Sequence, residues 1–512
     1  MKSAGSNPFL DSVFVLKLIG VFVAALLAIF VGFFVVSYAN PFTTTILTAA
    51  IAMSSVAIVH PRAGLYLLIV TTGYLDLVKR LGVLTDSLSE LDITVTLAVA
   101  PLLMLSICLG VVIRNILERK RLESWQWVIL ALLIVCMGGV ALQPFRGGAG
   151  FLQGVQSFVN SGGYLPMILI TSMILPEPED SLKVLRFALW VFLPVALYGI
   201  WQQIFGFNNF EVRFLESGYT ITVGDLDDVR PRPFSTLNSP HTLSVCTAIF
   251  AGVALFVPFK GGQRLLWQYP VSLVYISGCL ATIGRSGIFI MPITLVGWLC
   301  FRRKWATCLF YGAILGGLIL LMVNAEPVLD RLGSLEKLLP MNDNSDVSNE
   351  AFRLGTFSER LMSFHNGLTN PRFHTLFGDP DAAKADDQHS YRETVAHDQI
   401  TQTLVQYGLV GLAISVLITM TGLVIAHRAV LRLRDRTTRE VAIALLSILT
   451  AVIYSGMMFG SHLGLFPVDF FFAFLVGILI VCCAKGEFHH RGREDTKLRE
   501  EREIWGSDLG SA

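Results

Sequence analysis

Residues 409–426 read LVGLAISVLITMTGLVIA, and no charged side chain interrupts this run. A helix of about 20 predominantly apolar residues spans the hydrocarbon core of a bilayer. A similar block lies at residues 21–36, and hydrophobic residues make up 53% of the 512-residue chain while only 15% are charged. A soluble chain of this size needs roughly a quarter of its residues charged. The sequence therefore predicts an integral membrane protein.

Apolar blocks of this kind recur along the chain and predict an all-α polytopic membrane protein with about 14 transmembrane helices. The predicted spans are residues 13–36, 42–59, 63–78, 91–113, 126–143, 151–175, 185–206, 241–258, 267–283, 287–301, 305–323, 403–426, 441–460 and 464–483. The third span is the weakest, because it is short and ends in Asp76, Lys79 and Arg80. All eight cysteines fall inside spans without the spacing of a zinc site, so we expect apolar core residues and no metal.

Lysine and arginine are concentrated in alternate connections, and cytoplasmic loops carry an excess of these residues. The basic connections are residues 114–121, 183–186, 260–264, 302–304 and 428–439, followed by a tail from Lys485. We therefore expect both termini in the cytoplasm. The predicted organisation begins with N-terminal helices 1–7 in residues 1–206, a first periplasmic loop in 207–240 and helices 8–11 in 241–323. A large, partly helical periplasmic loop follows in 324–402, then helices 12–14 in 403–483 and a charged cytoplasmic tail in 484–512.

Arg285 stands in a break between two predicted spans, in the stretch Thr282-Ile-Gly-Arg285-Ser286-Gly287. An arginine near the bilayer centre costs about 2.5–3.5 kcal/mol, so arginines in such positions usually mark a site or a pairing. Small neighbours leave this guanidinium accessible, and its donors suit phosphate oxygens. The alternative is an arginine that reaches the lipid headgroups without binding a substrate.

A second polar stretch, residues 229–241, reads VRPRPFSTLNSPH and leads directly into a predicted span. Asn238, Ser239 and His241 are candidates for capping that helix, whose N-terminus favours an anion. Arg230 and Arg232 add positive charge beside it. The alternative is an ordinary helix start with solvated arginines.

The large loop carries Arg360 and closes with His397 and Asp398, after which the pattern predicts a helix leading into the twelfth span. A histidine at the membrane surface can take a proton from a hydroxyl nucleophile. The alternative is an ordinary surface histidine. The acidic stretch at residues 378–389 is interpreted as solvated rather than as a calcium site.

Together these features resemble the O-antigen ligase and O-unit polymerase superfamily of bacterial inner-membrane proteins. The resemblance covers about residues 205–425 and depends on the order of the motifs. The stretches that carry the resemblance are Arg232 to Ser244 for R-x-x-G-x-x-x-N-P-N-x-x-A, Thr282 to Gly287 for T-x-S-R-G/S, and Arg360 to Leu368 for R-x-x-x-W/F-x-x-A/G-L. They continue with Pro371 to Gly378 for P-x-x-x-x-x-G, with one residue more than the pattern, and Ala396 to Gly411 for A-H-N-x-x-x-x-x-L-x-x-x-G-L-x-G. Among the departures, His241 and Asp398 stand where the family has asparagine, Gly284 where it usually has serine, and Phe364 where tryptophan is common.

The resemblance implies a metal-independent, inverting glycosyltransferase without a cofactor. Such an enzyme transfers a glycan from undecaprenyl diphosphate to an acceptor hydroxyl at the periplasmic face of the cytoplasmic membrane. Arg285 and Arg360 would neutralise the departing diphosphate, and His397 would deprotonate the acceptor. The implied substrate-binding residues are Arg230, Arg232, Asn238, His241, Ser286 and Asp398. Expected partners are the lipid-linked oligosaccharide, an acceptor glycan or lipid, membrane lipids, a flippase and a chain-length regulator, but no nucleic acid.

Within this family we favour a polymerase of an exopolysaccharide or O-antigen repeat, because fourteen spans and 512 residues exceed what we expect of a ligase. A lipid A-core O-antigen ligase and an O-linked protein glycosyltransferase stay open as alternatives. A lipid-linked oligosaccharide flippase would place ionisable residues within its spans, around a central cavity and in two similar halves. The predicted spans hold few such residues, Lys17 and Asp469 among them, and polar residues gather on one outer face. That asymmetry favours an enzyme over a transporter, scaffold or receptor.

Overall fold

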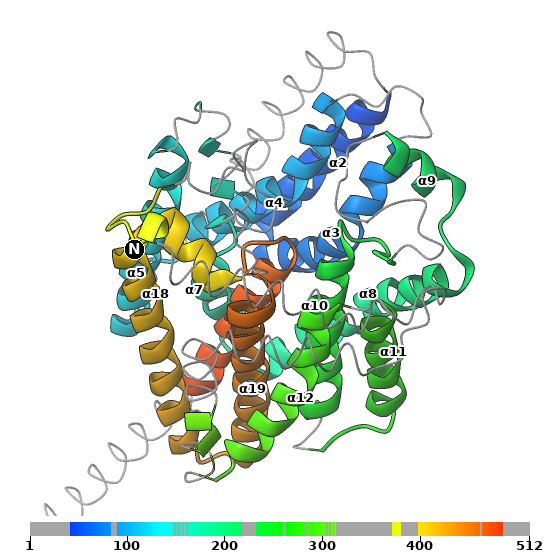
Figure 1. The fold of residues 1–512 in the computed structure, drawn as a ribbon. Helices are drawn as coiled ribbons and strands as arrows, with labels where there is room; N and C mark the ends of the chain where they lie inside the picture. Colours follow the sequence, from blue (N-terminus) through cyan, green and yellow to red (C-terminus); the bar gives the residue numbers. More distant parts are fainter. Residues whose placement is uncertain are drawn as a thin grey trace, which may run out of the picture.

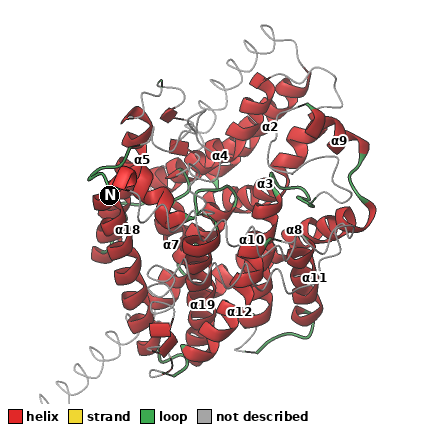
Figure 2. Ribbon diagram, viewed as in Figure 1, coloured by secondary structure: helices red, strands yellow, loops and turns green. Residues whose placement is uncertain are grey.

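The computed structural model describes a large part of the chain. The described residues are 41–82, 90–146, 150, 154–155, 158–159, 162–217, 232–259, 263–282, 284–303, 306, 309–310, 312–313, 371–379, 398–460 and 463–484. Within them every regular element is a helix (Figures 1 and 2), as the sequence predicts. Six described helices are long and apolar enough to cross a membrane.

The helices follow most of the apolar blocks closely. They are α2 (Pro41–Val59), α3 (Pro61–Leu81), α4 (Glu90–Leu117), α5 (Ser124–Arg146), α7 (Met167–Ile174), α8 (Pro178–Phe205), α9 (Asn209–Glu216), α10 (Pro240–Phe256), α11 (Gln268–Ala281), α12 (Arg285–Cys300), α18 (Gln399–Arg432), α19 (Arg436–Phe459) and a last helix over Val468–Ala484, with a short 3-10 helix, η2, at Pro371–Phe373. The predicted span at 151–175 is interrupted by a turn at residues 163–166, which the short helix α7 follows. The predicted spans at 13–36 and, for the most part, 305–323 lie outside the described residues. The six long helices are α2, α4, α5, α8, α18 and α19, whereas α10, α12 and Val468–Ala484 are apolar but shorter.

Helices α10 and α19 form the centre of the bundle, and α5 and α18 lie at one side of it (Figure 1). In the most apolar part of α19, 89% of the residues are buried, whereas the corresponding share is 6% in both α5 and α18. The exposed side chains of α5 include Trp127, Val128 and Val135, and those of α18 include Leu417 and Ile425. Apolar surface on outer helices is what contact with lipid requires.

Three phenylalanines from distant parts of the chain join the centre. The rings of Phe192 in α8 and Phe250 in α10 have centroids 4.7 Å apart, and Phe471 in the last helix packs edge-on at 4.9 Å from each. Aromatic pairs at these spacings contribute about 0.5–1.5 kcal/mol beyond the area that they bury. The cluster ties α8, α10 and the last helix into one scaffold.

Candidate functional site

The ends of several helices meet at one end of the bundle. Arg80, in the last turn of α3, donates from Nη2 to the carbonyl oxygen of Leu237 just before α10, at 3.1 Å. The hydroxyl of Ser244 in α10 donates to the carbonyl oxygen of Gly284 just before α12, at 2.8 Å. We call this end, defined by Arg80, Leu237, Ser244 and Gly284, the loop end.

Arg80 is the anchor of the first predicted loop. Its side chain is 2% exposed and donates from Nη1 to Glu211 Oε1 in α9 at 3.1 Å, while that glutamate is fully buried. Nε donates to the Asp76 carbonyl at 3.1 Å, and the guanidinium lies 4.5 Å from the ring centroid of Phe234. The charged end of α3, which weakens the prediction of span 63–78, is therefore buried against the loop. As a consequence α3 runs to Leu81 rather than ending at residue 78.

Gln202 in α8 holds the same loop from the other side. Its Nε2 donates to Glu211 at 2.7 Å, and its Oε1 accepts the backbone N–H groups of Phe234 and Ser235 at 3.2 and 2.6 Å. The Ser235 hydroxyl donates to the Val195 carbonyl at 2.5 Å. Buried polar groups that are satisfied in this way fix one conformation. The chain that leads to α10 is thus rigidly placed.

The predicted capping of α10 is confirmed for one residue. Ser239 is the N-cap, and its Oγ accepts the backbone N–H of Thr242 at 3.2 Å. Asn238 does not cap the backbone, because its Oδ1 accepts the hydroxyl of Thr242 at 2.9 Å instead. His241 is also not a cap, since it already lies inside the helix, after Pro240. Asn238 therefore positions the helix start through a side chain.

Arg232 reaches the break between α11 and α12. Its Nε donates to the Thr282 carbonyl at 3.1 Å, which joins two of the predicted motifs directly. Arg285 follows as the first residue of α12, is partly exposed, and keeps its Nη1 atom shielded from solvent. A Cβ atom at Gly284 would lie 2.3 Å from Ser244 Oγ, and one at Gly287 would lie 2.4 Å from the Ser244 carbonyl oxygen. The break therefore requires glycine at both positions.

The end of α19 closes the same cluster. A Cβ atom at Gly460 would lie 2.7 Å from His241 Cε1 and 3.3 Å from Ser286 Oγ, so both side chains lie directly against this glycine. The hydroxyl of Ser455 donates to the Ser286 carbonyl at 2.8 Å. The starts of α10 and α12 and the end of α19 thus meet around His241 and Ser286. The sequence gives no signal for Gly460.

Asp398 has a structural role at the start of α18. It is the N-cap, 3% exposed, and its Oδ1 accepts the Thr401 backbone N–H at 2.7 Å. Its second oxygen, Oδ2, is buried and has no hydrogen-bond partner among the described residues. Burial raises the pKa of this carboxyl, although the hydrogen bonds from Thr401 oppose the shift. The helix therefore begins at Gln399, directly after His397 and Asp398 in sequence.

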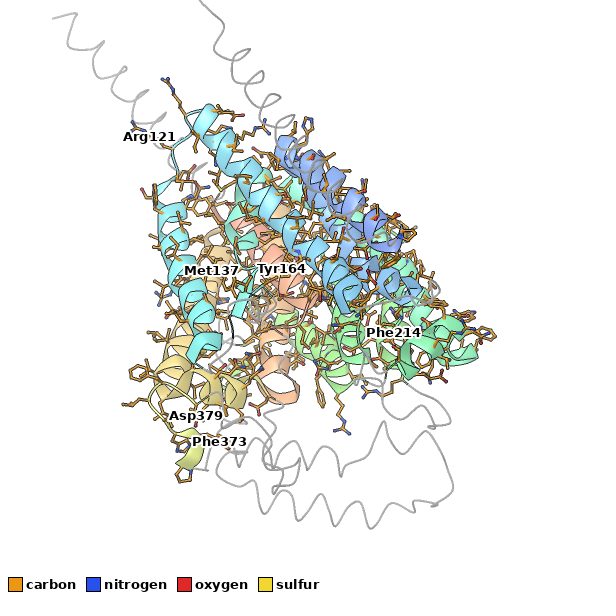
Figure 3. All side chains as sticks on the ribbon, turned by 90° about the horizontal axis from the view of Figure 1, so that it is seen from above. Arg121, Met137, Tyr164, Phe214, Phe373 and Asp379 are labelled. Carbon is orange, nitrogen blue, oxygen red and sulfur yellow. The ribbon has the colours of Figure 1, made fainter. Side chains whose placement is uncertain are left out.

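Residues 371–379 dock onto a break inside α18, at Gly408 within the predicted span at 403–426. The backbone of Gly408 has φ 71° and ψ −168°, a region that is essentially limited to glycine. Three backbone hydrogen bonds hold the segment there: Asp379 N to Val405 O at 2.8 Å, Leu409 N to Thr375 O at 3.0 Å, and Val410 N to Leu376 O at 3.1 Å. Figure 3 places Phe373 and Asp379 beside the yellow end of α18. Two of the motifs in the sequence, ending in Gly378 and Gly411, therefore form one structural unit.

Replacing Gly408 with alanine is expected to release residues 371–379 from α18. A Cβ atom there would lie 2.3 Å from the Gly378 backbone nitrogen and 2.5 Å from the Leu376 carbonyl carbon, and backbone atoms cannot move aside locally. The disfavoured φ and ψ add to this overlap, so we expect a cost of about 3 kcal/mol or more. Hydrogen exchange at the amides of Asp379, Leu409 and Val410 measures the release.

The matched control is Gly422→Ala in the same helix, where an added Cβ atom meets nothing within 4 Å. Alanine is the better helix former by about 1 kcal/mol, so this variant should leave the three amides protected. Equal exchange in Gly408→Ala and Gly422→Ala would refute the docking.

The structure brings together five of the predicted site residues, and it describes a sixth as a helix cap. Those that meet at the loop end are Arg232, Asn238, His241, Arg285 and Ser286. Asp398 belongs to the unit formed by α18 and residues 371–379. Arg230, Arg360 and His397 lie outside the described residues. No family model matches the chain, and no curated protein matches it either.

Proposed function

We propose that this chain transfers a glycan from undecaprenyl diphosphate to an acceptor hydroxyl, and that it does so as a polymerase of an exopolysaccharide or O-antigen repeat. The observation that carries the proposal is the meeting of two separate motif segments and the end of α19 at the loop end. Arg232 binds the Thr282 carbonyl, three residues before Arg285, and His241 and Ser286 share contact with Gly460. A diphosphate leaving group needs several positive groups in one place.

Two helix N-termini strengthen this electrostatic argument. α10 has 17 residues and α12 has 16, and Ser244 in the second turn of α10 donates to the carbonyl of Gly284, the N-cap of α12. Each helix N-terminus carries roughly half a positive charge and presents backbone N–H groups. Arg285 and Arg232 add two full charges beside these termini. The combination favours a diphosphate over a neutral sugar.

The arrangement also explains one departure from the family motif. The motif has serine where this chain has Gly284, and alanine where it has Ser244. The Ser244 hydroxyl donates to the Gly284 carbonyl and occupies the space that a side chain at position 284 would need. The Ser244 hydroxyl of α10 thus lies where the side chain of the motif's serine at position 284 would lie.

His397 is the proposed general base toward the acceptor hydroxyl, and Arg360 joins Arg285 at the diphosphate. Direct attack by the acceptor inverts the anomeric carbon, and guanidinium groups take the place of a metal. Fourteen spans with both termini in the cytoplasm put the loop end at the periplasmic face of the cytoplasmic membrane.

Deletion of the gene tests this function in the native host. A polymerase predicts that single repeats accumulate on the lipid carrier and that long polymer disappears, and the intact gene supplied in trans restores the polymer. Polymer that still forms on the carrier but fails to reach lipid A would identify a ligase instead. Unchanged single repeats together with normal polymer on its final acceptor would exclude both.

A further inference from the structure

A cavity of about 700 Å³ lies at the other end of α3. Arg62, at the start of that helix, lines it, and 18 residues of helix separate Arg62 from Arg80, which is about 27 Å along the axis. The remaining walls come from the end of α4, the start of α5, the end of α7 and the end of the Val468–Ala484 helix. The cavity is therefore distinct from the cluster at the loop end.

Four basic side chains line this cavity: Arg62, Arg114, Lys120 and Arg121. Within the described part of the chain, the one acidic side chain on its wall is Glu123, which accepts a hydrogen bond from the Trp125 indole at 2.6 Å. Figure 3 shows Arg121 at the connection between α4 and α5. The wall thus carries an excess of positive charge.

Two carboxylates that do not line the cavity form ion pairs with three of these cations. Asp180 binds Arg62 at 2.5 Å, and Glu118 binds Arg114 Nε at 2.7 Å and Lys120 at 2.6 Å. Neither carboxylate lines the cavity, and the three basic side chains are 50%, 59% and 67% exposed. Among the described residues, Arg121 has no ion-pair partner. The cations are therefore preorganised and still accessible to an anion.

The rest of the lining is apolar. Val111, Met173, Ile174 and Val481 come from three helices, and Trp125 lies at the start of α5. Tryptophan is enriched at membrane–water interfaces, and basic pockets between transmembrane helices bind anionic headgroups. A ligand that satisfies both parts of the wall has a phosphate group and an apolar chain.

We propose that this cavity binds the phosphate group of an anionic lipid, taken from the leaflet opposite the loop end. The phosphate lies among Arg62, Arg114 and Arg121, and the acyl chains follow the apolar wall. This site does not depend on the glycan-transfer proposal, because none of its residues belongs to the loop end.

The test uses the purified full chain and native mass spectrometry with defined lipids. We expect wild type to retain phosphatidylglycerol in preference to phosphatidylcholine. Removing two cations in Arg114→Gln/Arg121→Gln should weaken that binding roughly tenfold or more. Ala484→Phe narrows the cavity and keeps every charge, and it should weaken binding of phosphatidylglycerol as well. Arg436→Gln removes an exposed arginine that does not line the cavity and should bind as wild type does.

Glycerol phosphate separates the two possible sources of the phosphate. If it does not displace phosphatidylglycerol, the ligand is a lipid. If glycerol phosphate displaces the lipid, and the cavity variants weaken its binding as much as they weaken lipid binding, the cavity binds phosphate but its ligand is soluble. Equal retention of phosphatidylglycerol by wild type and both cavity variants, or no preference over phosphatidylcholine, would overturn the proposal.

Discussion

Replacing Glu211 with alanine is expected to lower the free energy of unfolding by about 3–5 kcal/mol. The variant leaves the Arg80 guanidinium, 2% exposed, without its carboxylate partner in a buried position. It also removes the acceptor of Gln202 and the carboxylate that completes the capping box of α9 with Asn208. Thermal unfolding of the purified protein, followed by tryptophan fluorescence, measures the loss.

An ion pair at the other end of α3 is the matched control. Asp180 pairs with Arg62 at 2.5 Å, but the two side chains are 24% and 50% exposed. Exposed pairs contribute at most about 1 kcal/mol, so Asp180→Ala should change stability little. In addition, replacing Arg80 and Glu211 together with Met and Leu should recover much of the loss, because no unpaired charge then stays buried. Equal destabilisation by Glu211→Ala and Asp180→Ala would show that Arg80 does not depend on this partner.

The same ion pair explains where prediction from sequence fails. Hydropathy treats Asp76, Lys79 and Arg80 as solvated charges, and therefore predicts a short, weak third span. In the structure Arg80 binds partners that lie 131 and 157 residues further along the chain, and all three charged residues are buried. A pattern within one window contains no information about such partners.

The helical segments were predictable because their apolar blocks are long and lie between polar stretches. The site was predictable only in part. The order of the motifs indicates that Arg232, His241 and Arg285 belong to one site. The contacts of each side chain, however, depend on how α10, α12 and α19 pack against one another. Gly460 lies outside every motif. Gly408 belongs to the last motif, but its hydropathy is that of an ordinary apolar helix, and the break is seen only in its backbone angles and in the hydrogen bonds from residues 371–379.

Replacing Arg285 with alanine is expected to lower the rate of glycan transfer by about 10²–10³-fold, the usual effect of removing one preorganised donor from a developing negative charge. Arg285 is the first residue of α12, so in the proposed function its guanidinium and the helix N-terminus would act on the same anion. Its contribution would grow as the bond to the diphosphate breaks, and we therefore expect kcat to fall more than KM rises. Turnover of a polyprenyl diphosphate-linked repeat in proteoliposomes measures both constants.

Arg285→Lys separates charge from geometry. A lysine keeps the charge but not the planar pair of donors, so the variant should stay well below wild type if the guanidinium binds two phosphate oxygens. Arg428→Ala removes an exposed arginine near the other end of α18 and should transfer at the wild-type rate. Both Arg285 variants must also melt at the wild-type temperature, because Arg285 Nη1 is shielded from solvent and its loss can affect packing. Wild-type turnover in a stably folded Arg285→Ala protein would show that the diphosphate does not bind at the loop end. Wild-type turnover in Arg285→Lys, together with low turnover in Arg285→Ala, would show that only the positive charge matters and not the geometry of the guanidinium.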